Sequence, residues 1–202
     1  MIISNISFEK KKFLVSFDNG EEIKISEDTL VNFGLYKGQE VEEEFVKNLK
    51  FEDEKSEALL LSYKFLQRNK TKQQLVDYLY KNKIQRDTID LVLPILEEKK
   101  YLNDEDYARR YLSDALNIKK YGKIKTRYML MSKGIDKKLI EKVMEDYDYE
   151  LEYMNALELI EKRISKDETD PKIINSAKNY LQGRGFEFEI INFTLDDYLG
   201  VE

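Results

Sequence analysis

A fixed spacing of 51 residues is the feature that most constrains the fold of this chain. Three segments align at that spacing without a gap, and four apolar columns keep their register across them. The columns hold Tyr78, Met129 and Tyr180; Leu79, Leu130 and Leu181; Ile89, Ile140 and Ile191; and Leu93, Met144 and Leu195. Apolar positions at helical spacing indicate amphipathic helices. We therefore expect three tandem helical modules, each with a long first helix followed by a tight helix pair.

The ends of the predicted helices carry local signals of their own. Gly134 and Gly185 follow the second helix of their modules, where glycine accepts the left-handed conformation that satisfies the last carbonyls. Lys83 holds the same place in the first module. Thr71 and Gln74 have the spacing of a capping box, which predicts a helix start at this point.

The first fifty residues follow a different pattern from the rest. Short apolar runs alternate with polar residues, and Asn19 and Gly20 stand between two of these runs. An Asn-Gly pair between alternating runs indicates a β-hairpin. We expect a mainly α fold: a small β-rich N-terminal domain (1–50), a first helical module (51–102), a basic second module (103–150) and an acidic third module (151–202). Three stacked three-helix modules would make an elongated, curved molecule.

The composition excludes several classes of function. The 202 residues include no cysteine and no histidine, so disulfides, thiolate metal sites and histidine-based catalysis are absent. We therefore expect no enzyme activity, no cofactor and no metal. No apolar run approaches the ~18 residues of a membrane span, and the first residues do not resemble a signal peptide. We expect a cytoplasmic protein without membrane contact.

The charge distribution points to a binding surface. The net charge is −6, but residues 107–142 hold 11 basic and 3 acidic residues, whereas residues 143–202 hold 6 and 15. A one-sided basic block repels itself unless something negative binds it. The predicted contact residues for a filament or a nucleic acid are Arg109, Arg110, Lys119, Lys120, Lys123, Lys125 and Arg127.

The acidic run from Asn103 to Asp106 allows two interpretations. Its carboxylates could bind a divalent metal, or Asn103 or Asp104 could cap a helix whose positive end favours the other acids. We favour the cap, because no other carboxylate pair has a spacing that completes a site. We assign the neighbouring Tyr101, Tyr107 and Tyr111 to the module core.

Two stretches resemble a known family. The string from Tyr101 to Tyr111 is similar to the central signature of the RecX family of RecA recombinase modulators, a tyrosine-leucine-x-aspartate element followed by an aromatic-alanine pair. The string from Gly122 to Ile135 resembles the second signature of that family, a glycine before a helix that ends in Lys-Gly-Ile. Tyr107 stands where the family often has phenylalanine, and Lys100 stands where glycine often precedes the tyrosine.

The resemblance implies a non-enzymatic regulator with RecA as its partner. Such a protein would bind the RecA filament on single-stranded DNA and inhibit ATP turnover, strand exchange and filament stability in recombination, DNA repair and the SOS response. We expect a monomer, and the basic module would be its anchor. One alternative is a stand-alone nucleic-acid-binding helical protein; another is an enzyme with a metal bound at Asp104 and Asp106.

Overall fold

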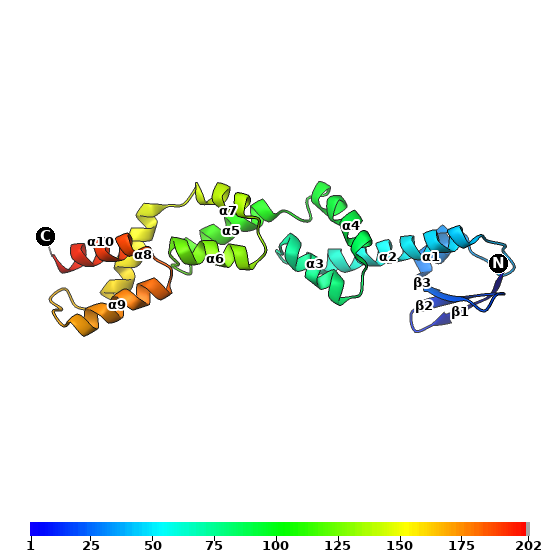
Figure 1. The fold of residues 1–202 in the computed structure, drawn as a ribbon, viewed down its shortest axis with the longest axis horizontal. Helices are drawn as coiled ribbons and strands as arrows, with labels where there is room; N and C mark the ends of the chain where they lie inside the picture. The colour runs from blue at the N-terminus through cyan, green and yellow to red at the C-terminus, as the bar shows by residue number, and fades with distance from the viewer. Residues whose placement is uncertain (201–202) are drawn as a thin grey trace. The chain divides into compact units, whose positions relative to one another are not determined.

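The computed structural model describes residues 1–200 of the chain. It divides into two compact units. Unit 1 contains Met1–Arg68 and Leu75–Tyr101. Unit 2 contains Asn69–Gln74 and the described residues from Leu102 onward. The chain is mostly helical with one small sheet near its N-terminus, which confirms the predicted mainly α fold (Figure 1).

The sheet of unit 1 is antiparallel and has three strands in sequence order. They are β1 (Ile3–Glu9), β2 (Lys12–Phe17) and β3 (Glu22–Ile25). Val15 in the central strand pairs with Ile6 on one side and Ile23 on the other. Val15 and Ile25 are fully buried, so alternation along the strands places one face of the sheet against the core.

Two tight turns connect these strands. Gly20 has a φ of +85°, and the Asn19 side chain accepts a hydrogen bond from the Glu21 amide at 3.0 Å, so the predicted Asn-Gly hairpin is confirmed. The other turn places Lys10 and Lys11 at φ values of +45° and +75°. The sequence does not predict this turn, because lysine is an unusual residue in the left-handed region.

The helices associated with the first part of the chain are α1 (Glu27–Asn32), α2 (Glu43–Phe65), α3 (Lys72–Lys81) and α4 (Arg86–Glu98). The helical period of the sequence is clear only from Ala58 to Phe65 and predicts a helix that starts at Ala58; this start is wrong, because α2 begins at Glu43. The charged residues before Ala58 hide the helical period, although Val46 and Leu49, one turn apart, are buried against the core of the sheet.

The assignment of Tyr101 to a core was also wrong. Tyr101 is 56% exposed, although its ring lies 5.0 Å from that of Tyr63. Lys100 takes a left-handed φ of +60° directly after α4, and the chain leaves the helix at this point. The tyrosine therefore covers the surface of α2 instead of filling an interior.

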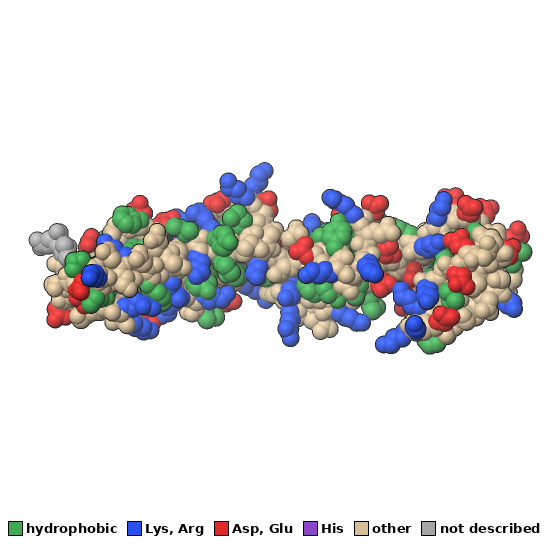
Figure 2. Space-filling view, turned by 60° about the horizontal axis from the view of Figure 1, so that its bottom comes forward, with side chains coloured by type: hydrophobic (Ala, Val, Ile, Leu, Met, Phe, Trp, Pro, Cys, Tyr) green, Lys and Arg blue, Asp and Glu red, His purple; other side chains and the backbone are tan. Residues whose placement is uncertain are grey.

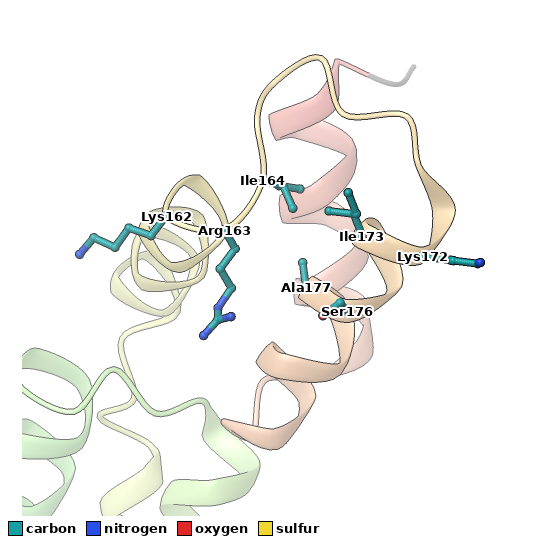
Figure 3. A pocket seen from close by; sticks show the side chains of 7 residues that line it. All are labelled: Lys162, Arg163, Ile164, Lys172, Ile173, Ser176 and Ala177. Carbon is teal, nitrogen blue, oxygen red and sulfur yellow. The ribbon is translucent and has the colours of Figure 1, made fainter.

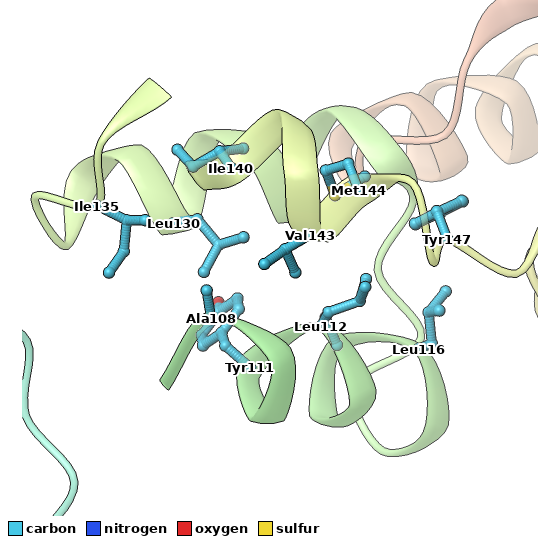
Figure 4. Packing of buried hydrophobic residues seen from close by; sticks show 11 residues of the cluster. Ala108, Tyr111, Leu112, Leu116, Leu130, Ile135, Ile140, Val143, Met144 and Tyr147 are labelled. Atoms are coloured by element: carbon cyan, nitrogen blue, oxygen red, sulfur yellow. The ribbon is translucent and has the colours of Figure 1, made fainter. Parts of the chain in front are cut away.

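The second module lies in unit 2 and consists of α5 (Asp104–Asn117), α6 (Lys123–Ser132) and α7 (Lys137–Met144). Its core is built from small and branched residues of α5 that face α6 and α7 (Figure 4). Leu130 and Val143 are fully buried, and Tyr111 is 8% exposed. Tyr107 packs against this cluster, as predicted.

The third module repeats this arrangement with α8 (Tyr149–Glu161), α9 (Pro171–Gly183) and α10 (Phe188–Leu199). Leu181 and Leu195 belong to its core. The predicted leucine column is confirmed, since Leu79, Leu130 and Leu181 are all fully buried. The repeat in the sequence is therefore a repeat of core positions.

The predicted helix boundaries are confirmed where a specific residue marked them. Gly134 and Gly185 have φ values of +78° and +85°, and Lys83 takes +66° without being glycine. Thr71 and Gln74 exchange reciprocal side-chain bonds to each other's amides, each at 3.2 Å, as a capping box requires.

One contact recurs between successive parts of the chain. A carboxylate of a long helix accepts a hydrogen bond from a backbone amide at the start of an earlier helix. The pairs are Asp53 with Ser26 (2.8 Å), Asp104 with Lys72 (2.8 Å) and Glu152 with Lys123 (3.0 Å). Each carboxylate satisfies an amide that has no partner inside its own helix and lies at the positive end of the helix dipole.

The glycines of unit 2 allow a close joint between its two modules. Gly122 donates its amide to the Arg184 carbonyl at 3.0 Å, and Ile124 donates to the Gly185 carbonyl at 3.0 Å. A Cβ atom on Gly122 would overlap the Gly185 carbonyl, and one on Gly185 would overlap the backbone of Lys125. The two backbones approach so closely that only glycine fits at either position.

Candidate functional site

The seven predicted contact residues all lie in the second module. Arg109 and Arg110 are on α5; Lys119 and Lys120 are in the turn after it; and Lys123, Lys125 and Arg127 are on α6. Most of their side chains also interact inside the protein. The residues of the basic block therefore make contacts within the protein and also give its surface a positive charge.

The two arginines of α5 pair with carboxylates of the second module. Arg109 contacts Glu105 at 3.0 Å and also pairs with Asp146, and Arg110 contacts Asp106 at 2.9 Å. Lys142 also bonds to Glu105 and, together with Arg109, holds the pKa of that carboxyl below its usual value. The acidic run thus has partners within the protein.

The start of α5 agrees with the cap interpretation of that run. The Asn103 side chain accepts a hydrogen bond from the Asp106 amide at 3.0 Å, which makes Asn103 the N-cap. Asp104 accepts from Lys72, and Glu105 and Asp106 lie in the first turn, where the helix dipole favours negative charge.

Three cations of the turn and of α6 contact the third module. Lys120 pairs with Glu158, Lys123 lies 3.5 Å from Glu187, and Lys125 donates to the Gly183 carbonyl at 3.2 Å. Lys120, aided by Lys162, lowers the pKa of Glu158 to about 2. The basic block and the acidic module therefore neutralise each other partly within unit 2, a pairing that residue counts alone do not reveal.

Tyr121 is a member of this joint that sequence reasoning missed. The ammonium of Lys125 lies 4.5 Å from the centre of its ring, the guanidinium of Arg184 5.3 Å and the ammonium of Lys119 6.0 Å. A ring face attracts cations through its quadrupole. The Lys119 ammonium also lies 4.5 Å from the ring of Tyr111. The presence of tyrosines beside a basic run was the feature of the sequence that could have predicted these cation–ring contacts.

Glu152 is the most enclosed charge in the joint. It has no exposed surface, and one carboxyl oxygen accepts from the Lys123 amide. The other oxygen makes no hydrogen bond of standard geometry among the described residues, although the buried Tyr147 side chain interacts with this carboxyl and acts to lower its pKa. Burial raises the pKa of Glu152, while the Lys123 amide acts in the opposite direction.

The outer face of α6 is apolar. Arg127 is held by Glu141 at 2.9 Å, but Ile124, Tyr128 and Met131 are 54%, 61% and 59% exposed. Figure 2 shows hydrophobic side chains at the surface beside lysine and arginine side chains. Their spacing places Ile124, Tyr128 and Met131 on one side of α6, next to Arg127, but it does not show that solvent surrounds them.

Three further lysines enlarge the basic surface. Within residues 1–200, Lys133, Lys137 and Lys138 have no carboxylate at ion-pair distance. Lys137 and Lys138 are exposed at the start of α7, while Lys133 is half-buried. They were not among the seven predicted residues, although they belong to the same basic block.

The third module has a shallow hollow of about 400 Å³ between α8 and α9. Ile164, Ile173 and Ala177 line it, whereas the side chains of Lys162 and Lys172 extend away from it (Figure 3). Lys162 pairs with Glu158 at 2.6 Å. Nothing about this hollow indicates a particular ligand.

Within residues 1–200, no helix combines the length and the apolar character that crossing a lipid bilayer requires.

The fold and the site define a class of protein. In this class, tandem three-helix modules follow a small sheet along the chain, and a charged joint connects a basic and an acidic module. Family models agree with this arrangement. The model of the second three-helix domain of RecX matches residues 103–144, and that of the third matches residues 150–195.

Similar proteins extend the match to nearly the whole chain. Regulatory protein RecX of Clostridium botulinum (strain Alaska E43) is 30% identical over 198 residues, 96% of this chain and 92% of its own length. Its counterpart in Streptococcus mutans is 27% identical and covers 98% of this chain and 77% of its own length. A crystal structure of regulatory protein RecX matches with a TM-score of 0.74 at 20% identity, over 97% of this chain and all of its own. The chain belongs to the RecX family of regulatory proteins.

Proposed function

We propose that this protein regulates RecA by binding its filament on single-stranded DNA and inhibiting ATP turnover and strand exchange. The observation that carries the proposal is the similarity to regulatory protein RecX of C. botulinum along nearly the whole chain. The family name implies RecA as the regulated partner. The protein would act without chemistry of its own, by occupying the filament and changing its dynamics.

The second module would be the anchor on the filament. Its basic block supports this, because Arg110 is 65% exposed and Lys137 and Lys138 are exposed as well. Lys120 and Lys123 would contribute less directly, since their side chains also hold the third module in place. We therefore extend the seven proposed contact residues by Lys137 and Lys138.

The test is the rate of DNA-dependent ATP hydrolysis by RecA with increasing amounts of this protein. We expect the natural chain to lower the rate. A variant with Arg110→Glu, Lys137→Glu and Lys138→Glu should inhibit much less, since each change reverses a charge without touching the joint. A matched control with Lys166→Glu and Lys172→Glu alters exposed lysines of the third module and should inhibit normally.

The alternative function gives a different result in the same experiment. A stand-alone nucleic-acid-binding protein would leave RecA unaffected and bind naked DNA with an affinity that falls steeply with salt, by about one unit of log-log slope per phosphate contact. That combination of results would reject the RecA proposal and favour the alternative.

A further inference from the structure

The outer face of α6 carries an unusual row of apolar side chains. Ile124, Tyr128 and Met131 follow one another at intervals of four and three residues, so they share one side of the helix. All three are more than half exposed. They do not belong to the core of the second module, which lies on the other side of α6 and includes Leu130.

The repeat provides an internal control for this row. The same positions of α3 hold Gln73, Asp77 and Tyr80, and those of α9 hold Asn175, Asn179 and Gln182. All six are exposed. In α9 the three-helix scaffold folds with amides at all three positions, and in α3 only Tyr80 carries a ring, so the scaffold does not require the complete apolar row of α6. Exposed apolar residues gathered on one side mark an interaction surface.

The surroundings of the row indicate the chemistry of its partner. No acidic residue occurs between Ile118 and Ile135, and Arg127 lies on the same side of α6 as the row. A matching surface would carry apolar side chains flanked by carboxylates, as an acidic amphipathic helix does when it places its apolar face on a helix or groove.

A protein fits this surface better than a nucleic acid does. Of the three side chains, only Tyr128 offers a ring on which a base could stack, and Ile124 and Met131 are aliphatic. Methionine also adapts well to the shape of a protein partner.

We propose that the Ile124, Tyr128 and Met131 face of α6 is a protein-docking surface that receives an acidic, amphipathic segment of a RecA subunit. This inference rests on the proposed function, because it takes RecA as the partner. It adds that the contact is made to protein through apolar side chains, while the lysines contribute to orientation and salt dependence.

The test replaces the three apolar residues on the outer face of α6 with the residues that α9 carries at the same positions. The variant carries Ile124→Asn, Tyr128→Asn and Met131→Gln, the residues that α9 has at the same positions. Binding of fluorescently labelled protein would be measured to RecA filaments on single-stranded DNA and, separately, to the naked DNA. A control with Met154→Gln and Phe188→Gln removes two exposed apolar side chains from α8 and α10, and circular dichroism would compare the folding of all three proteins.

We expect the α6 variant to bind filaments on the order of tenfold more weakly or worse, since a few central apolar residues dominate such contacts. Its binding to naked DNA should not change, and the control should bind like the natural chain. The proposal is wrong if the variant binds filaments normally, or if it loses naked DNA and filaments equally, which would make the row a nucleic-acid surface. If the natural chain does not bind filaments, the proposed function itself fails.

Discussion

The second and third modules share one scaffold and differ in what they expose. Leu130 and Leu181 fill the same core position and are both fully buried. On the outside, α6 shows an apolar row in basic surroundings, whereas α9 shows amides at the same positions. The core positions therefore report how the chain folds, and the outer positions report what each module does. The following predictions test this separation.

The largest expected effect comes from truncating the leucine that occupies the equivalent core position in each module. Leu130→Ala and Leu181→Ala should each lower the free energy of unfolding by about 2 to 5 kcal/mol, because each leaves a cavity at a fully buried site. Urea denaturation followed by circular dichroism would measure both. If one of the two substitutions left the free energy of unfolding unchanged, Leu130 and Leu181 would not hold equivalent core positions.

The next effect should come from the joint between these modules. Gly185→Ala should cost about 2 to 4 kcal/mol, since it adds a side chain at a φ of +85° and overlaps the backbone of Lys125. Gly200→Ala is the matched control: Gly200 has a φ of +66°, but among residues 1–200 no atom outside its chain neighbours lies within 4 Å of an added Cβ. Equal losses of unfolding free energy in the two variants would show that the joint is not closely packed.

Glu152 gives the joint a pH dependence. Burial raises the folded-state pKa of Glu152 above its ordinary value of 4.5, so the folded state holds the proton more tightly than the unfolded state. The corresponding stability is complete below the unfolded pKa and is lost as pH rises through the folded pKa. Unfolding free energies measured between pH 4 and pH 8 should show the natural chain losing stability relative to Glu152→Gln. A constant difference would contradict this account.

The smallest effect should come from the partly exposed ion pair between Lys120 and Glu158. Ion pairs that solvent still reaches contribute little to stability, so Lys120→Ala should change the melting temperature least of all these variants. The pKa of Glu158, lowered to about 2, means that the pair stabilises the protein above about pH 4.5 and is lost as pH falls towards 2. In an NMR titration, the midpoint of Glu158 should rise in the variant. An unchanged midpoint would show that Lys120 is not its main partner.

Much of this fold could be predicted from the sequence because its signals are local. The left-handed glycines and the capping box at Thr71 depend on residues a few positions apart, and the buried leucine column depends on a local helical pattern that recurs every 51 residues. The start of α2 at Glu43 could not be predicted, because Val46 and Leu49 are buried by a sheet whose contact with them is not local in sequence.

The candidate site shows the same limit more strongly. Charge counts identified the basic block, but the pairing of Lys120 with Glu158 and of Lys123 with Glu187 depends on how two modules meet. The exposure of Tyr128 likewise follows from which side of α6 the core occupies. Spacing alone placed residues on a helix face without saying whether that face was inside or outside.

The most direct test of the central claim is the rate of RecA strand exchange in the presence of the natural chain or of the variant in which α6 carries Asn, Asn and Gln at positions 124, 128 and 131. Both proteins should have the same helix content and unfolding free energy within about 1 kcal/mol, as expected for exposed positions. We predict that the natural chain blocks strand exchange and that the variant does not. Equal inhibition by both proteins would contradict the separation between a shared scaffold and a functional outer face.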